Sequence, residues 1–342
     1  MRIAVIGAGA VGGLLAALAA RAGHEVLVSA RGEHADAVAH AGLRVDGGWG
    51  EWVAEVGLLE SIPPLPDRAA ARFNLLLLAT KAHDSAAALG PWAMHAGTPV
   101  LVVQNGLGGD QVARAVLPNS PVAIGLALFA VSLTAPGTLT VTGPNGITLG
   151  GDAAAVAVAE QLLRSSLPAD GSAELVLAPD IRGAQWTKLL INQVNALPAI
   201  TGYSVQQTVA NPALRGILAR GMVETIAVGD ALDVQWGRIG AVDAGTIAAV
   251  RSGGAAAAAD LAQRLAAGMG DVPNPASMLQ SIRRGRTTEV DAINGAIVSH
   301  GAELGIPTPI NAALVELVHR VEGSAEFFSV DDVVEAIPAA SP

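Results

Sequence analysis

Cysteine is absent from this chain of 342 residues, and lysine is almost absent, since only Lys81 and Lys188 occur among its twenty lysine and arginine residues. Without cysteine the chain has no disulfide framework, no thiolate nucleophile and no cysteine-based metal site, which fits a reducing cytoplasm. Aromatic residues make up only 3% and the net charge is −10. Both features disfavour nucleic acid as a partner, because binding it needs a basic stripe and stacking platforms.

One hydrophobic run imitates a targeting segment, because Arg2 is followed by apolar and small residues as far as residue 20. The glycines Gly7, Gly9, Gly12 and Gly13 are unfavourable in a membrane-inserting helix, so a strand, a turn and a helix explain the run better than a signal peptide does. No other stretch approaches the roughly 20 apolar residues that cross a bilayer. We therefore expect no membrane partner.

The same N-terminal segment has the spacing of a dinucleotide-binding turn, G-x-G-x-x-G, between a strand at residues 2–6 and a helix at residues 14–21. In such a turn the first glycine permits the tight bend, the second lets the pyrophosphate approach the backbone, and the third lets helix and strand pack closely. Unpaired amides at the helix start then hold the phosphates. The predicted cofactor-binding residues are Gly7, Ala8, Gly9, Ala10, Val11 and Gly12.

The next predicted strand, at residues 24–31, ends in Ser29, Ala30 and Arg31. NAD-specific folds usually place a carboxylate here to accept from the ribose 2′-hydroxyl, whereas an arginine suits a 2′-phosphate. We therefore predict NADP(H) as the cofactor, with Arg31 as its 2′-phosphate ligand. The alternative is an ordinary surface arginine at the end of a strand.

Two further apolar runs, at residues 73–79 and 99–103, predict parallel strands that are covered on both faces. Ligands of open α/β sheets bind outside the carboxyl ends of the strands. Lys81 follows the first run and could reach a phosphate, and Asn105 follows the second and could contact the nicotinamide ribose or a substrate. After Pro121 an alternating pattern predicts an antiparallel extension that closes this domain near residue 180.

The chain exceeds the length at which a single hydrophobic core stops growing, so two domains are expected. From about Ile181 onward the pattern is helical. We predict an α/β protein with an N-terminal Rossmann-type, NADP-binding domain at residues 1–180 and an all-helical domain with the substrate and catalytic groups at residues 181–342.

The helical half contains a polar stripe, because Lys188, Asn192 and Asn195 are spaced at i, i+4 and i+7 among leucine and isoleucine. A buried amine with two amides needs partners, either from the protein or from a polar ligand. Unlike arginine, lysine can lose its proton when it is desolvated. Lys188 is therefore the candidate proton donor.

A second polar run extends from Ser277 to Gly295 and predicts a helix, a break at Gly285 and a new helix with the carboxylates Glu289 and Asp291 in its first turn. Taken alone, helix capping and surface ion pairs explain this run about as well as a ligand site does.

Together these segments resemble the ketopantoate reductase family, which are 2-dehydropantoate 2-reductases that use NADPH. The resemblance extends to about residue 320, and it rests on the glycine turn, Arg31, Thr80-Lys81, Gln104-Asn105-Gly106, Trp186-x-Lys188-Leu-x-x-Asn192, Ser277-Met-x-Gln280 and Arg286-x-Thr288-Glu289-x-Asp291. It implies a Rossmann domain, an all-helical domain, an active site in the cleft between them and a role in pantothenate and coenzyme A biosynthesis.

The resemblance also implies roles for individual residues. Lys188 is then the general acid that protonates the carbonyl oxygen as hydride arrives. Asn105, Asn192 and Ser277 hold the 2-oxo acid, and Glu289 bridges the cofactor and the substrate hydroxyl. We add Asn195 to the substrate-binding set because it shares the polar stripe.

The chain departs from the family pattern in its substrate region. The family's second helix asparagine follows the first by four residues, whereas here Ala196 takes that place and Asn195 lies one residue earlier. A further asparagine, expected about ten residues on, is replaced by Val205-Gln206-Gln207, and an aspartate expected after Ser-Met-x-Gln is Ser281. The cofactor turn is unaltered. The sequence therefore supports NADPH-dependent reduction of a 2-oxo acid more strongly than it supports ketopantoate as the particular substrate.

Other functions remain to be weighed. A serine hydrolase lacks its Gly-x-Ser-x-Gly elbow. A metal site is not expected, because no His-x-x-x-His pair occurs among the histidines, which we interpret mostly as surface or satisfied polar residues: His24, His34, His40, His83, His95, His300 and His319. A reductase of another 2-oxo acid and a non-catalytic NADPH-binding sensor stay open. The partner is expected to be a small-molecule 2-oxo acid, and a homodimer is compatible with the helical half.

Overall fold

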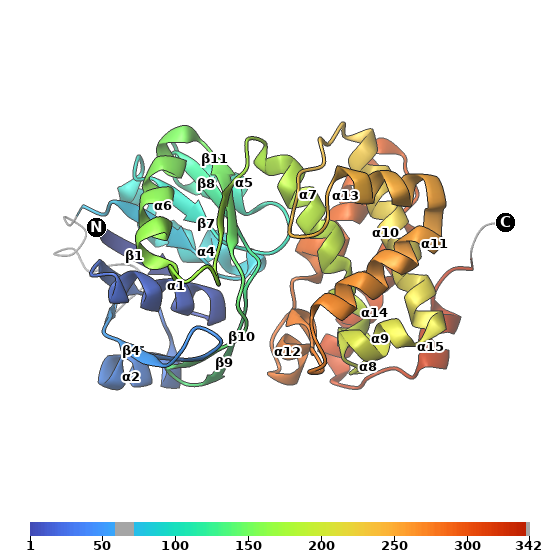
Figure 1. Cartoon of the computed structure of the whole chain (residues 1–342), viewed down its shortest axis with the longest axis horizontal. Coiled ribbons are helices and arrows are strands. Elements are labelled where there is room, and N and C mark those ends of the chain that lie inside the picture. The colour runs from blue at the N-terminus through green and yellow to red at the C-terminus, as the bar shows by residue number, and fades with distance from the viewer. Residues whose placement is uncertain (59–71, 340–342) are drawn as a thin grey trace. The chain divides into compact units, whose positions relative to one another are not determined.

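The computed structural model describes residues 1–58 and 72–339. The chain divides into two compact units, Met1–Ile181 and Arg182–Pro342 (Figure 1). The first unit contains both sheets, and the second is helical.

Unit 1 is built on an eight-stranded sheet in the order β12-β11-β8-β7-β6-β1-β2-β5. The strands from β5 to β8 are parallel, β11 is antiparallel to β8, and β12 is parallel to β11. Counted along the chain, the six parallel strands have the doubly wound order 3-2-1-4-5-6, which confirms the predicted Rossmann-type fold. The strands are β1 (Arg2–Ile6), β2 (Glu25–Val28), β5 (Gly57–Leu58), β6 (Leu75–Leu78), β7 (Val100–Val102), β8 (Val122–Ala127), β11 (Ile147–Gly151) and β12 (Leu175–Leu177).

Apolar side chains cover both faces of this sheet, as the continuous apolar runs predict. In β1, Ile3 and Val5 belong to one buried core and Ala4 and Ile6 to the other, because successive side chains of a strand point to opposite faces. The first core includes residues of α1 (Ala10–Arg21), α2 (Gly32–Ala41) and α6 (Ala153–Ser166). The second includes residues of α4 (Ser85–Leu89), η2 (Gly90–His95) and α5 (Gly109–Val116), and η1 (Ala82–Asp84) precedes α4.

A second sheet of four strands lies in the order β4-β3-β10-β9. Its strands are β3 (Leu43–Gly47), β4 (Trp52–Ala54), β9 (Ala130–Ala135) and β10 (Thr138–Gly143). The predicted antiparallel extension is correct for β9 with β10 and for β8 with β11, but β10 also pairs in parallel with β3. That pairing joins segments almost a hundred residues apart, and a local alternating pattern does not encode it.

Unit 2 contains helices and, within its described residues, only one isolated β-bridge, between Ile239 and Val242. Its longest helices begin with side-chain caps: Asn211 accepts from two amides of α10, and Asp243 accepts from the Thr246 amide of α11. The elements are α7 (Ile181–Asn192), η3 (Gln193–Asn195), α8 (Ala196–Thr201), α9 (Val205–Ala210), α10 (Pro212–Ala231), α11 (Ala244–Gly268), α12 (Ser277–Arg283), η4 (Asp291–Gly295), α13 (Ala296–Leu304), α14 (Pro309–Ser324) and α15 (Val330–Ala336). In the described part of the chain, no helix has both the length and the apolar composition that spanning a membrane requires.

Candidate active site

The three glycines of the turn after β1 meet three different local demands. Gly7 has φ +98°, and an added Cβ would lie 2.7 Å from the Thr80 nitrogen. A Cβ on Gly12 would lie 2.1 Å from the Gly7 carbonyl oxygen and 2.8 Å from Ala79 Cβ. At Gly9 no atom lies within 4 Å of the Cβ position, so this glycine faces open space. Two glycines are thus required for packing, and the third leaves room for a ligand to approach.

The helix after this turn starts earlier than predicted. Helix α1 begins at Ala10, not at Leu14, with Gly9 as its N-cap and no side-chain cap. The first amides of a helix have no intrahelical partner. The second half of the glycine motif is therefore the first turn of α1, and its amides are available to an anion.

Arg31 lies just beyond β2, at the N-cap position of α2. Its side chain is exposed, and within residues 1–58 and 72–339 it forms no ion pair with a carboxylate. The guanidinium that we predict to bind the 2′-phosphate is therefore not engaged by a carboxylate of the described residues.

Polar residues at the ends of β6 and β7 are tied together by Gln104. Its amide nitrogen donates to the Thr80 carbonyl at 2.5 Å and to Ser85 Oγ at 2.7 Å. Lys81 and Asn105, which follow these residues, are both partly exposed. Since Thr80 also contacts Gly7, the predicted residues of unit 1 gather at the carboxyl ends of β1, β6 and β7.

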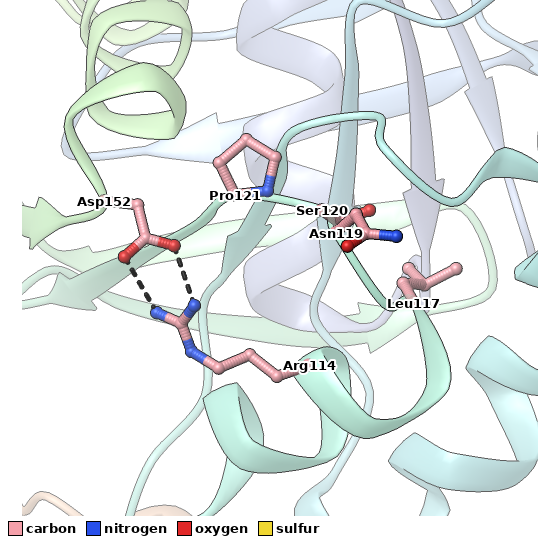
Figure 2. A pocket seen from close by; sticks show the side chains of 6 residues that line it. All are labelled: Arg114, Leu117, Asn119, Ser120, Pro121 and Asp152. Carbon is pink, nitrogen blue, oxygen red and sulfur yellow. Dashed lines mark hydrogen bonds and ion pairs between the residues drawn. The ribbon is translucent and has the colours of Figure 1, made fainter.

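A surface cavity of about 580 Å³ lies at the other end of the sheet, where Pro121 precedes β8. Figure 2 shows the Arg114 guanidinium bound to both oxygens of Asp152, at 2.7 and 3.0 Å. Asp152 also accepts from the Val122 amide. The bonds from Arg114 and Val122 lower the pKa of Asp152. This pair fixes the start of β8, and none of the predicted site residues lines the cavity.

In unit 2, Lys188 lies on α7 and is only partly exposed. Desolvation of its ammonium lowers its pKa to about 8. Asn192, one turn further along the same helix, is buried. The amine thus lies on the same helix face as a buried amide and can exchange its proton near neutral pH.

The predicted α-helical stripe does not continue to Asn195, because α7 ends at Asn192 and residues 193–195 form a 3₁₀ turn. In a 3₁₀ turn, side chains at i and i+3 are eclipsed. Asn195 therefore lies on the same side of the helix as Asn192, although only three residues separate them along the chain. The Asn195 amide nitrogen donates to the Asn192 carbonyl at 2.9 Å, and its Oδ1 accepts from Ser277 N at 3.2 Å and Ser277 Oγ at 3.3 Å. Two predicted substrate residues are therefore in direct contact.

The segment before Ser277 is held by the glutamine that replaces a family asparagine. Gln206 donates to the Gly270 and Val272 carbonyls and accepts from the Asn274 amide. Ala276, next to Ser277, has φ +58° and ψ 160°, a conformation that only glycine adopts readily. Gln207 caps α9 together with Ser204. Both glutamines thus form bonds within the protein, at the place where the resemblance leads us to expect an asparagine.

Glu289 lies in a turn that is fastened on both sides to α14. The Thr288 amide donates to Glu322 at 2.6 Å, and His319 bridges Glu322 and Asp291 at 2.9 Å each. Partial burial opposes ionisation of His319, but its bonds to Glu322 and Asp291 raise its pKa. The new helix predicted after Gly285 begins at Asp291, so Asp291 is in its first turn, whereas Glu289 precedes the N-cap and is not. This first turn, η4, is a π-turn, a feature frequent at functional sites.

A buried amide chain holds the next turn. Asn294 donates to Gln193 at 2.9 Å and to Asn311 at 3.0 Å, and Asn311 in turn donates to Glu224. Sequence reasoning missed these partners because they lie 17 to 101 residues apart along the chain. Their only local signal is the occurrence of amides within apolar helices.

His34 is a satisfied polar residue, as the sequence predicts, but its partners lie far away in the sequence. Its ring bonds the carbonyl of Ala8 inside the glycine turn. Across the described residues, no group of three or more histidine, aspartate or glutamate side chains could hold a metal ion.

Comparison with known proteins identifies relatives over almost the whole chain. The family described as "Ketopantoate reductase PanE/ApbA" matches residues 3–153, and its "C terminal" counterpart matches residues 180–322. A 2-dehydropantoate 2-reductase of Mesorhizobium japonicum is 31% identical, over 94% of this chain and 98% of that protein.

Solved structures show the same fold. A PanE/ApbA family ketopantoate reductase from Ralstonia eutropha JMP134 superposes with a TM-score of 0.76 at 27% identity, covering 95% of this chain and 99% of that one. D-mandelate dehydrogenase with NADH and anilino(oxo)acetate superposes with a TM-score of 0.78 at 23% identity, with the same coverage.

Proposed function

The chain belongs to the ketopantoate reductase family, and from this premise we propose that it is an oxidoreductase that reduces 2-dehydropantoate to pantoate with NADPH. The observation that carries the proposal is Lys188, an amine whose pKa is lowered to about 8 by desolvation and which shares a helix face with the buried Asn192. Such a group suits proton donation near neutral pH.

The residues of unit 1 fit an NADP(H) cofactor. Gly9 leaves space at the N-terminus of α1, where the amides of the turn would hold the pyrophosphate. Arg31 would bind the 2′-phosphate, Lys81 would reach a phosphate, and Asn105 would contact the nicotinamide ribose or the substrate. NADPH, when bound, supplies the hydride for the C2 carbonyl.

Lys188 supplies the proton in this proposal. Hydride addition to a ketone builds negative charge on the carbonyl oxygen, and a positioned ammonium both stabilises that charge and protonates the oxygen. The ammonium then becomes a neutral amine. With a pKa of about 8, it regains its proton from solvent at neutral pH.

Amide and hydroxyl groups orient the 2-oxo acid in this scheme. Asn192 and Asn105 would hold the substrate, and the Asn195–Ser277 pair presents a hydroxyl and an amide next to Asn192. Glu289 would accept from the substrate hydroxyl, from a turn that His319 and Glu322 keep in place.

Reduction of a different 2-oxo acid is the second candidate, and the bonds of Gln206 and Gln207 favour it. Both side chains are committed to the loop before Ser277 and to the cap of α9, so neither replaces the family's substrate asparagine. The pocket would then recognise the substrate with one amide fewer. A single missing polar contact of this kind changes substrate preference strongly.

We also propose a cellular location and an assembly for the enzyme. We expect the enzyme to act in the cytoplasm, where NADPH is available, and a homodimer is the assembly compatible with its helical unit. Sedimentation at several protein concentrations would show whether a dimer forms.

The substrate is tested by a panel. NADPH oxidation is followed with 2-dehydropantoate, pyruvate, 2-oxoisovalerate and an aryl 2-oxo acid, and the product is identified by mass. The highest kcat/KM with 2-dehydropantoate would support the proposal, and turnover of another acid alone would support the second candidate. NADPH binding without any turnover would instead assign the chain to the sensor class.

A further inference from the structure

The imidazole of His34 joins three segments of unit 1 that are far apart in the sequence. Its Nε2 lies 2.8 Å from the carbonyl oxygen of Ala8, in the glycine turn, and its Nδ1 lies 2.9 Å from the amide nitrogen of Gly137. His34 itself is on α2, and Gly137 is in the turn between β9 and β10. The residue is only partly exposed.

These partners fix the tautomer of the ring. The Gly137 amide can only donate, so Nδ1 must be the acceptor. The proton therefore resides on Nε2, which donates to the Ala8 carbonyl. Both nitrogens of a neutral imidazole are satisfied in this arrangement, and each bonds a backbone group.

The bond to Ala8 determines the direction of the next amide. The Ala8 N–H already donates to the Ser29 carbonyl at 2.9 Å, so both backbone groups of Ala8 are held. In a trans peptide the C=O and the following N–H point in opposite directions. Holding the Ala8 carbonyl toward His34 thus turns the Gly9 N–H away from it. Within the described residues this N–H has no protein partner.

Glycine cannot set this orientation by itself. Gly9 has no side chain to restrict its backbone, and no atom lies within 4 Å of its Cβ position. The N-cap of α1 has no side-chain hydrogen bond either. The bond from His34 is the side-chain contact that holds the carbonyl of the Ala8–Gly9 peptide.

We propose that His34 is a positioning residue of the cofactor site: it holds the Ala8–Gly9 peptide so that the Gly9 amide is presented to the pyrophosphate of the dinucleotide. The proposal rests on the proposed function only in assuming that the glycine turn binds a dinucleotide. It predicts an effect on cofactor affinity and none on the chemical step.

Two substitutions separate the two bonds. The amide nitrogen of glutamine can take the position of histidine Nε2, so His34→Gln keeps a donor for Ala8. The amide oxygen of asparagine can take the position of Nδ1, so His34→Asn keeps only the acceptor for Gly137. His40→Asn, at an exposed histidine of the same helix, is the matched control.

The dissociation constant of NADPH is measured by fluorescence titration, with kcat at saturating NADPH and the melting temperature measured alongside. We expect His34→Asn to weaken binding about tenfold, the effect of one lost hydrogen bond that orients a ligand group. His34→Gln and His40→Asn should stay within about twofold of wild type, and kcat and melting temperature should be preserved.

Equal losses in the asparagine and glutamine variants, or a lower affinity that follows a lower melting temperature, would show a packing role and overturn the proposal. Unchanged affinity in His34→Asn would overturn it as well. Since the readout is affinity, these outcomes decide the role of His34 whether or not the wild type reduces any 2-oxo acid.

Discussion

At the scale of single residues, the sequence predicts the role of Lys188 but not its pKa. Its identity as the candidate acid follows from its scarcity and from its spacing to Asn192. Its lowered pKa could not be predicted, because desolvation depends on side chains that the fold brings from elsewhere. The same limit applies to His34, whose partners lie 26 and 103 residues away.

The pH dependence of turnover tests the state of Lys188. Only the protonated amine can donate, so kcat should be constant below the pKa and fall as the pH rises through about 8. A stopped-flow or steady-state profile with saturating substrates measures this. An alkaline limb displaced to near 10.5 would contradict the desolvation of the amine.

Stability provides an independent readout of the same amine. A lysine whose folded pKa lies below its unfolded value of 10.5 destabilises the protein at neutral pH, because the unfolded chain holds the proton more tightly. Lys188→Met should therefore raise the free energy of unfolding at pH 7, by on the order of 1 to 3 kcal/mol. The gain should shrink as the pH rises from about 8 toward 10.5. Denaturant titrations at two pH values measure it, and a variant less stable than wild type at pH 7 would refute the buried charge.

Arg31 should decide the choice between cofactors. Its guanidinium is exposed and forms no ion pair in the described part of the chain, so Arg31→Ala should leave the fold intact. Loss of a charge-assisted bond to the 2′-phosphate should raise KM for NADPH by about 10-fold or more and leave KM for NADH unchanged. Parallel titrations with the two cofactors test this. An unchanged KM for both cofactors would show that Arg31 is an ordinary surface arginine, and an equal rise for both would contradict its role as the 2′-phosphate ligand.

At the scale of elements, the sequence predicts local structure, but it does not predict the pairing of strands that are far apart along the chain. The glycine turn and the strands β1, β6 and β7 follow from short motifs and continuous apolar runs. The parallel pairing of β10 with β3 and the 3₁₀ turn at residues 193–195 did not, because each depends on distant neighbours or on a one-residue change in spacing. That turn explains how a shortened spacing still places Asn195 at Ser277.

The glycine turn offers a matched pair of substitutions. Gly12→Ala places a Cβ 2.1 Å from the Gly7 oxygen, so it should lower the melting temperature and the cofactor affinity together. Gly9→Ala meets no atom within 4 Å and keeps an allowed φ of −72°, so it should fold normally and lose affinity alone. Thermal melts and NADPH titrations distinguish them. A stable Gly9→Ala protein that binds NADPH as wild type does would contradict the phosphate site.

At the scale of the whole molecule, the sequence assigns cofactor binding to the first unit and the substrate and catalytic groups to the second. Unit 1 contains the residues proposed to bind the cofactor, and unit 2 contains Lys188, the proposed acid. The turn of Glu289 is held by the bonds of His319 and Glu322. The chain's net charge is −10, so the anionic cofactor and substrate that we propose would have to be bound by local cationic groups such as Arg31 and Lys81, and not attracted by the overall field.

This division is tested most directly by comparing wild type with Lys188→Ala in one assay of NADPH oxidation by 2-dehydropantoate, with NADPH affinity measured on the same samples. We predict that kcat falls by about 10²–10⁴-fold in the variant while the NADPH dissociation constant stays unchanged. An undiminished kcat would contradict Lys188 as the acid, and absence of turnover in the wild type would contradict the proposed reaction.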